Sequence, residues 1–313
     1  MGGVVDSSDG LPVLERLDFS NSRAGKGMGS LVRALRSGKL GALAEMKLNN
    51  SNMPEEAIRD LSAGVREGGL SGISSLQLKS NPDQRRGGRM WGEFMQAIAE
   101  SQRGLPKLQY LDFSGHEDFA IGKPVIAALA SGNVRLLKRL DFESFPPTAG
   151  ITLSGGSLGI LCEGVREGMF PPGLKADMRL KIDPREGSFD SLLTAIAESK
   201  TGLPPCISSL DFGGLKSVMR GARFSEEALA ILAASGGRNS AGKLSHLEEV
   251  NMSYCDIDDQ KLKRLGEVFS AYGCSSLKFL DLRWIPAVCR GDLYKTKRRP
   301  CSSAPLNHLS LIT

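Results

Sequence analysis

Residues 108–113 of the chain read LQYLDF, with apolar side chains at the first, fourth and sixth positions. This six-residue pattern, the hexad, returns as LERLDF at 14–19, LAEMKL at 43–48, ISSLQL at 73–78, LKRLDF at 137–142, ISSLDF at 207–212, LEEVNM at 247–252, LKFLDL at 277–282 and LNHLSL at 306–311. A weaker copy, LKADMRL, begins at Leu174 with one additional residue. Apolar and polar residues that alternate over so short a stretch predict a short strand with one buried face.

The intervals between hexads predict one helix after each strand. Successive hexads start 29 to 40 residues apart, which is enough for a strand and a full helix. Between two of them, Ile58, Leu61 and Val65 recur at helical spacing, and Gly68 can end that helix in the left-handed conformation. Parallel strands lie about 4.8 Å apart and packed helices roughly 8–10 Å apart, so a stack of such units must curve. The sequence therefore predicts an α/β solenoid, a horseshoe with parallel strands on its concave face and helices on its convex face.

The repeats resemble a known family. The hexads, their spacing of about 29 residues and the helical second halves are similar to the ribonuclease-inhibitor-like class of leucine-rich repeats, which also occurs in NOD-like receptors and Ran GTPase-activating proteins. That class usually has Asn or Cys three residues after the hexad, where the side chain holds the backbone. Here only Asn81 and Cys255 match, while Ser22 and Ser51 stand at two of the other positions. We therefore expect looser turns than in a regular array.

The resemblance covers nearly the whole chain, which implies a single solenoid of about ten repeats over residues 1–313. Neither end carries a polar cap, so we expect poorly capped terminal repeats and a chain that is part of a longer protein. A second level of repetition lies above the first. GVREG occurs at 64–68 and 164–168, and AIAES at 97–101 and 195–199, each AIAES followed after two residues by Gly-Leu-Pro. A block of three repeats has been duplicated.

Composition excludes several classes of function. The net charge of +5 is spread among side chains of both signs, so nucleic-acid binding is disfavoured. No apolar run approaches the roughly 20 residues of a membrane span. The six Cys are scattered without a C-x-x-C pair, which predicts reduced thiols in the cytoplasm, with the nucleus also possible. His116, His246 and His308 belong to no catalytic or metal-binding motif, so we expect no enzyme, no cofactor and no small-molecule substrate.

Three intervals are longer because of insertions rich in Gly, Pro and Arg, at 81–89, 144–156 and 213–223. We interpret all three as loops, either contributing to binding or varying neutrally at exposed tips. The segment 285–304 is basic and contains KTKRRP, which fits either a localisation signal or a solvated loop.

The candidate partner-binding residues are those of the concave face where aromatic side chains coincide with charged ones. They are Tyr110, Arg139, Asp141, Glu248, Glu249, Phe279, Asp281, Arg283 and Trp284. Exposed aromatics beside Arg are the residue types that dominate protein interfaces. For Trp284 an inward position, as a cap over the last repeats, is the alternative. The Asp that recurs at the fifth hexad position is interpreted as part of a soluble sheet surface.

These observations predict a non-catalytic protein-interaction module that binds a protein partner through the concave face and the inserted loops. Two alternatives stay open. The resemblance to Ran GTPase-activating proteins implies a regulator of a small GTPase, although none of that family's functional residues can be placed here. The basic segment near the C-terminus would suit contact with nucleic acid or a membrane surface.

Overall fold

The computed structural model of the protein describes residues 10–23, 27–81, 89–112, 114–115, 122–141, 151–153, 155–174, 176, 178–182, 189–214, 223–235, 243–272, 274–283 and 285. The chain forms two compact units. Unit 1 comprises Met1–Gly150 and Met169–Ala176, and unit 2 comprises Ile151–Gly168 and Asp177–Thr313.

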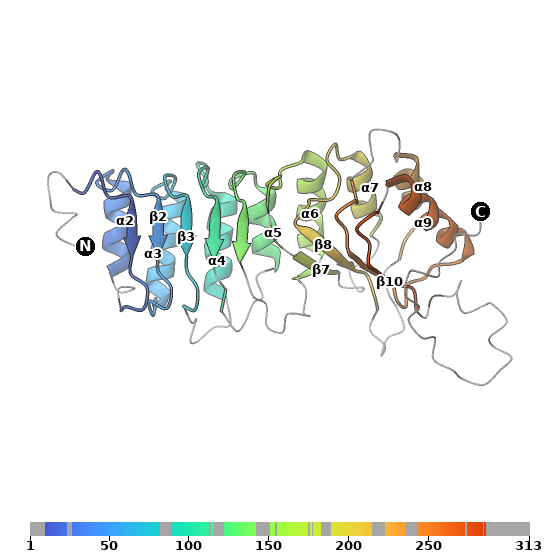
Figure 1. Ribbon diagram of the computed structural model, residues 1–313, viewed down its shortest axis with the longest axis horizontal. Coiled ribbons are helices and arrows are strands. Elements are labelled where there is room, and N and C mark those ends of the chain that lie inside the picture. The colour runs from blue at the N-terminus through green and yellow to red at the C-terminus, as the bar shows by residue number, and fades with distance from the viewer. Residues whose placement is uncertain are drawn as a thin grey trace. The chain divides into compact units, whose positions relative to one another are not determined.

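Unit 1 alternates strands and helices in chain order (Figure 1). Its elements are β1 (Arg16–Asp18), α2 (Met28–Arg36), β2 (Glu45–Lys47), α3 (Glu55–Arg66), β3 (Ser75–Gln77), α4 (Arg89–Glu100), β4 (Tyr110–Asp112), α5 (Gly122–Ala130) and β5 (Arg139–Asp141). The five strands pair in the order of the sequence, and every pair is parallel. Each helix therefore connects two neighbouring parallel strands, as the hexads predict.

Unit 2 repeats this arrangement. It contains β6 (Ile151–Leu153), α6 (Gly155–Glu167), β7 (Met178–Ile182), α7 (Asp190–Glu198), β8 (Ile207–Asp211), α8 (Glu226–Ser235), β9 (Glu249–Asn251), α9 (Asp259–Tyr272) and β10 (Phe279–Asp281). These strands also form a five-stranded parallel sheet in chain order. The pairing of β7 with β8 shifts register between Met178 and Arg179, which lie opposite Ile207 and Ser209. Leu180, and not Met178 as the weak hexad indicated, therefore lies opposite Leu210, the fourth position of its hexad.

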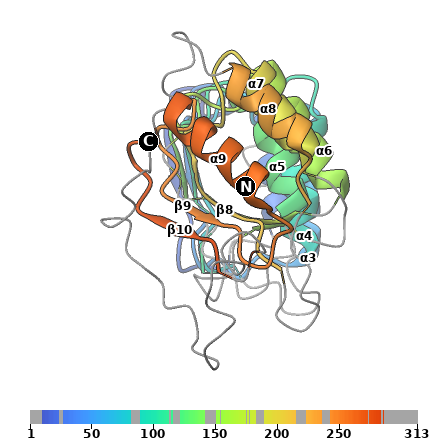
Figure 2. The ribbon, with the colours of Figure 1, turned by 90° about the vertical axis from the view of Figure 1, so that its right-hand side faces the viewer.

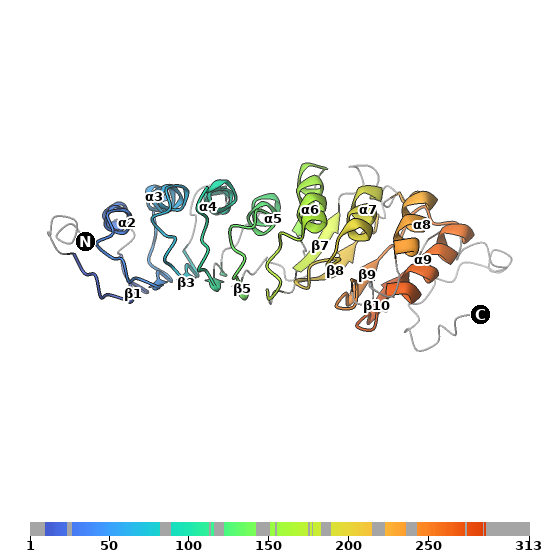
Figure 3. The ribbon, with the colours of Figure 1, turned by 90° about the horizontal axis from the view of Figure 1, so that it is seen from above.

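Each unit has a strand layer and a helix layer. In unit 2, α7, α8 and α9 lie to one side of β8, β9 and β10 (Figure 2). In unit 1, α2 to α5 lie side by side over the sheet when seen from above (Figure 3). The fourth hexad positions, such as Met46, Leu76 and Leu111, are buried between the layers. The fold is a leucine-rich-repeat α/β solenoid, which confirms the predicted fold class. That both units belong to one uninterrupted array of about ten repeats stays a prediction.

The insertion at 144–156 is not wholly a loop, so that prediction is wrong for part of it. Residues Ile151–Leu153 form β6, which pairs in parallel with β7, and Gly155 begins α6. Leu153 is completely buried, and Thr152 between the two apolar residues is exposed. The short ITL alternation is enough for a strand because β7 offers it a partner, whereas the surrounding glycines and prolines suggested a turn.

The backbone after the hexads is held more regularly than expected. Asn81 donates hydrogen bonds from Nδ2 to the carbonyl oxygens of Leu48 and Leu78, at 2.6 and 2.8 Å. Its Oδ1 accepts from the backbone N–H of Ser51 at 2.9 Å. Ser51 in turn donates from Oγ to the Leu48 carbonyl at 2.8 Å. One buried Asn therefore satisfies polar groups in two adjacent repeats.

The serines at the equivalent positions also hold the backbone, each through a hydrogen bond from its hydroxyl group. Ser22 Oγ donates to the carbonyl of Phe19 at 2.6 Å, just as Ser51 does to that of Leu48. The expectation of looser turns is wrong at these two repeats, because a hydroxyl three residues after the hexad reaches the same carbonyl that the Asn reaches. In unit 2, Cys255 Sγ lies 3.3 Å from the carbonyl oxygen of Phe212.

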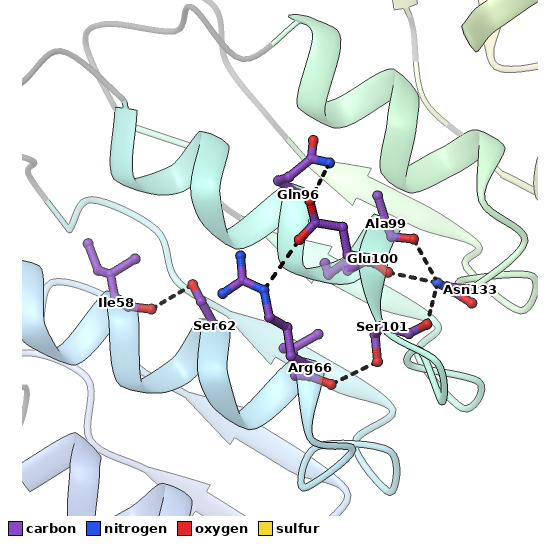
Figure 4. A network of polar contacts seen from close by, with 10 residues as sticks. Ile58, Ser62, Arg66, Gln96, Ala99, Glu100, Ser101 and Asn133 are labelled. Carbon is purple, nitrogen blue, oxygen red and sulfur yellow. Dashed lines mark hydrogen bonds and ion pairs between the residues drawn. The ribbon is translucent and has the colours of Figure 1, made fainter.

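The C-terminal ends of the helices are capped by side chains from the following repeat (Figure 4). Ser101 Oγ donates to the carbonyl of Val65 near the end of α3 at 2.9 Å. Asn133 Nδ2 donates to the carbonyls of Ile98 and Ser101 around the end of α4, at 2.8 and 2.9 Å. Since a helix leaves its last carbonyls without partners inside the helix, these bonds join each repeat to its neighbour.

The duplicated block is visible in the structure. The two copies of GVREG end α3 and α6, and the two copies of AIAES end α4 and α7. In the first copy Arg66 pairs with Glu100 at 3.4 Å, and in the second Arg166 pairs with Glu198 at 2.6 Å. The two copies thus share their helix ends and an ion pair between helices. A residue in one copy can therefore be compared with its counterpart in the other.

Candidate partner-binding surface

The third and fifth hexad positions point away from the helices and form what we name the open face of each sheet. Residues directly opposite each other on adjacent strands follow the register of the pairing. In unit 1, Tyr110 lies opposite Arg139, and Asp112 lies opposite Asp141. In unit 2, Phe279 lies opposite Glu249. The open face of each unit therefore carries one group of the predicted residues.

In unit 1 the three predicted residues and Asp112 form a linked group, the Tyr110 cluster (Tyr110, Asp112, Arg139 and Asp141). The Tyr110 hydroxyl donates to Asp141 Oδ2 at 2.9 Å and lies 3.2 Å from Asp112 Oδ2. The Arg139 guanidinium lies 5.1 Å from the centre of the Tyr110 ring and forms an ion pair with Asp141 at 2.7 Å. Both contacts hold the ring and the guanidinium in a defined orientation.

The electrostatics of the Tyr110 cluster follow from its two carboxylates. Side chains of like charge on facing strands repel, so Asp112 and Asp141 need a donor between them. The Tyr110 hydroxyl supplies it, and the Arg139 guanidinium neutralises Asp141. Partial burial raises the pKa of Tyr110, and the hydrogen bond to Asp141 with the negative charge of Asp112 raises it further. The ring consequently stays a neutral hydrogen-bond donor throughout the physiological range.

In unit 2 the structure brings four predicted residues together as the Phe279 patch (Glu249, Phe279, Asp281 and Arg283). Phe279, the first residue of β10, is 45% exposed, which is unusual for a large aromatic side chain. The Arg283 guanidinium, four residues further along the chain, binds Asp281 with two nitrogens, Nε at 2.9 Å and Nη2 at 2.6 Å. The patch thus combines an exposed ring with a cation that is fixed by a carboxylate.

Asp281 is buried although it belongs to the open face. Burial alone would raise the pKa of Asp281, but the side-chain and backbone hydrogen bonds from Arg283 outweigh it and hold that pKa below its usual range. The same carboxylate closes the end of its strand, because Oδ1 accepts from the backbone N–H of Arg283 at 3.0 Å. The charge of the patch is therefore maintained at neutral pH.

That backbone bond recurs at the fifth hexad position in both units. Side-chain oxygens there accept from the N–H two residues later at 2.9 to 3.0 Å, in Asp18, Asp112, Asp211, Asn251 and Asp281. This contact is the turn that Asp and Asn side chains make with their own backbone. The recurring Asp, interpreted from the sequence as a soluble surface, is thus also a turn-forming residue. Asp112 and Asp281 are also buried, whereas Asp18 makes the same bond and is exposed.

The candidate partner-binding residues predicted from the sequence do not include Arg179, which also belongs to this surface. Its guanidinium forms an ion pair with Glu249 at 3.1 Å, across β8 and seventy residues along the chain. Arg179 reaches that far because the residue between them on β8 is the short Ser209. The signal for this ion pair is a row of three residues on successive strands, Arg179, Ser209 and Glu249. The row is recognisable only once the register of the strands is known.

Two predicted residues contribute differently. Glu248 is paired with Lys278 at 2.9 Å, and both side chains are largely in solvent, so this pair contributes little to orientation. Trp284 lies outside the described residues, as do most of the inserted loops and the segment with KTKRRP. Of the aromatic sixth positions, Phe212 is buried, Phe19 is half-buried, and Phe113 and Phe142 are not among the described residues.

The described residues contain neither a metal-binding cluster nor a membrane-spanning helix. No group of three or more His, Cys, Asp or Glu side chains there is arranged to hold a metal ion. Among the helices of that same part of the chain, none combines the length and the apolar character needed to cross a membrane.

No protein-family model matches the sequence, and no curated protein does. Among solved structures, the crystal structure of the leucine-rich repeat-containing protein LegL7 from Legionella pneumophila is similar in chain path. It is 15% identical, with a TM-score of 0.32, and the match covers 90% of this chain and 89% of that chain. The assignment of the fold rests on the repeats themselves, with their parallel strands in chain order and a helix after each strand.

Proposed function

We propose that this chain is a non-catalytic protein-interaction module that binds a protein partner through the open faces of its sheets. The exposed Phe279 carries the proposal, because the same patch also presents an Arg held by a buried carboxylate. Aromatic and Arg side chains supply most of the energy of protein interfaces. Groups already fixed by Asp281 and Glu249 lose little conformational freedom on binding, which lowers the entropic cost of association.

Further assignments accompany this proposal. The repeats are assigned to the ribonuclease-inhibitor-like class, supported by intervals as short as 29 residues and by helices of 9 to 14 residues such as α2 and α9. A reducing compartment, the cytoplasm or the nucleus, is supported by Cys162, Cys206 and Cys255, which are buried free thiols. The Tyr110 cluster is proposed as a second contact region of the same kind.

The test is a comparison of partner capture by single variants. Phe279→Ala should weaken partner binding about ten-fold, or about 1.4 kcal/mol, because a central aromatic anchor is lost. Its melting temperature should change little, since the side chain is only half-buried. Phe279→Ala with Arg283→Ala should weaken binding further, although Arg283 also neutralises the buried Asp281.

Leu136→Ala is the matched control, because Leu136 is an exposed apolar side chain of unit 1, 54% exposed and outside both groups. Proteins retained by the wild type and by Leu136→Ala, but lost from Phe279→Ala, are identified by quantitative mass spectrometry. The same set of proteins retained by all three immobilised chains would place the binding site elsewhere.

A further inference from the structure

A groove of about 690 Å³ opens in unit 1 among the turns that follow α2, α3 and α4. We name it the helix-end groove. Half-buried Leu35 and exposed Pro106 form its apolar part, while Leu40, Leu43 and Ile73 also line it but are buried. Arg103 and Lys107 lie at its exposed side. Its volume lies within the range of roughly 300–1,000 Å³ that is usual for ligand sites. None of the residues of the open face lines it.

Two glycines allow arginines from different repeats to approach this groove. Gly68 has a φ of +78°, and a Cβ there would lie 2.5 Å from Cδ of Arg103. A Cβ on Gly69 would lie 2.7 Å from Cγ of Arg36. The side chains of Arg36 and Arg103, from two repeats, therefore rest against one Gly-Gly turn of the repeat between them. Any larger residue would displace them.

The groove carries an excess of positive charge. Arg36 is paired with Glu67, which also lines the groove. No carboxylate in the described ranges of the chain lies within ion-pair distance of Arg103 or Lys107, and both side chains are exposed. Three cations against one carboxylate leave an excess of two positive charges beside an apolar surface. An anionic group with an apolar neighbour would satisfy both features.

The duplicated block shows that the fold does not require these cations. Gly168, the counterpart of Gly68, has a φ of +64°, and the residue beside it is Thr201 rather than Arg. Gly-Leu-Pro follows in both copies, after which the first has Lys107 and the second Pro205. The turns after α4 and α7 thus form with and without the two charges. Neither helix dipoles nor turn geometry accounts for Arg103 and Lys107.

We propose that the helix-end groove binds a short acidic segment of a partner protein, in which carboxylate side chains flank an apolar one. The carboxylates would pair with Arg103 and Lys107, and the apolar side chain would lie against the apolar part of the groove. A nucleic acid or an anionic membrane is bound through an extended basic surface. The neighbouring Arg36 and Arg66 are already paired with Glu67 and Glu100, whereas Arg103 and Lys107 have no ion pair with any described residue. This site is independent of the open face.

Fluorescence anisotropy with a short labelled peptide of Glu, Asp and Leu tests the proposal on the full chain. The test variant is Arg103→Thr with Lys107→Ala. Thr is chosen because the second copy already has Thr201 at the position of Arg103. It should weaken peptide binding about ten-fold or more, because both cations of the site are removed. The matched control is Lys200→Ala with Lys263→Ala, which removes two exposed charges from unit 2 and should change the dissociation constant less than about two-fold.

Two further probes define the ligand. The same peptide with Gln and Asn in place of the acids should bind at least about ten-fold more weakly than the acidic one, and a single-stranded oligonucleotide should bind more weakly than the acidic peptide. Equal binding by the test variant and the wild type would overturn the proposal, as would an equal loss in the control variant. Tighter binding of the oligonucleotide would assign the groove to nucleic acid instead, and equal binding of the neutral peptide would remove the role of charge.

Discussion

His246 lies directly before the hexad at 247–252 and is only half-buried, yet its Nε2 atom is enclosed. That nitrogen has no hydrogen-bond partner among the described residues. Burial lowers the pKa of His246, and a hydrogen bond with the backbone of Pro204 opposes that shift only in part. The folded state consequently favours the neutral imidazole, because a charged ring would be poorly solvated there.

This environment predicts a loss of stability in mild acid. The folded pKa lies below the unfolded value of about 6.5, so the unfolded state takes up the proton first as the pH falls. The free energy of unfolding, measured in urea, should therefore decrease from about pH 6.5 downward, before most carboxylates titrate. His246→Leu should remove that part of the pH dependence, because Leu does not titrate. We expect the fold to accept Leu there, since Leu136 occupies the equivalent position before another hexad. An unchanged pH profile in this variant would contradict the expectation.

At the scale of elements, the connections between neighbouring helices depend on a few polar side chains. Asn133 alone donates to three carbonyl oxygens around the end of α4, those of Ile98, Ala99 and Ser101. In unit 2 the same region of α7 is contacted by Lys243, whose Nζ donates to the carbonyl of Ala197 at 3.0 Å. Different residues therefore cap equivalent helices, because the requirement is only a donor in reach of the last carbonyls.

Asn133→Ala should lower the free energy of unfolding by about 1–2 kcal/mol, since part-buried carbonyls of α4 would lose their donor. Gln102→Ala is the control, because Gln102 is exposed in the adjacent turn and should change stability by less than about 0.5 kcal/mol. Chemical denaturation of both variants gives the comparison. Indistinguishable midpoints would mean that water replaces the amide at no cost.

At the scale of the whole molecule, a substitution that disrupts one repeat of a solenoid also destabilises the neighbouring repeats, because each repeat buries its core only against those beside it. Leu111 on β4 is 1% exposed, whereas Lys79, just beyond β3, is exposed. The two residues belong to adjacent repeats of unit 1. Substituting each in turn therefore compares the effect on stability of a core position with that of a surface position in one region.

Leu111→Asp should cost several kcal/mol, because an unpaired carboxylate would be buried between sheet and helices. Hydrogen exchange should show the greatest loss of protection in β3, β4 and β5 with the helices packed on them. Lys79→Ala should cost about 0.5 kcal/mol or less. Comparable losses of protection in the two variants would mean that the buried and open faces have been exchanged.

The sequence by itself was sufficient for most of the described elements and for which of their residues face the core. Alternation over six residues and helical spacing over about twelve are local properties, so LQYLDF and its copies predict β4 and its relatives without tertiary information. The same reasoning placed Tyr110, Arg139, Asp141, Glu249 and Phe279 on the open face. It failed at β6, where the ITL alternation was too short to outweigh the glycines and prolines around it.

Only the tertiary structure decided which side chains meet. The pairing of Arg179 with Glu249, the caps formed by Asn133 and Ser101, and the approach of Arg36 and Arg103 to Gly68 and Gly69 all join different repeats. Such contacts depend on strand register and on the exact path of each turn, which six-residue patterns do not encode. The division into two five-stranded sheets likewise follows from hydrogen bonding between strands, because the hexads mark most strands but not their partners.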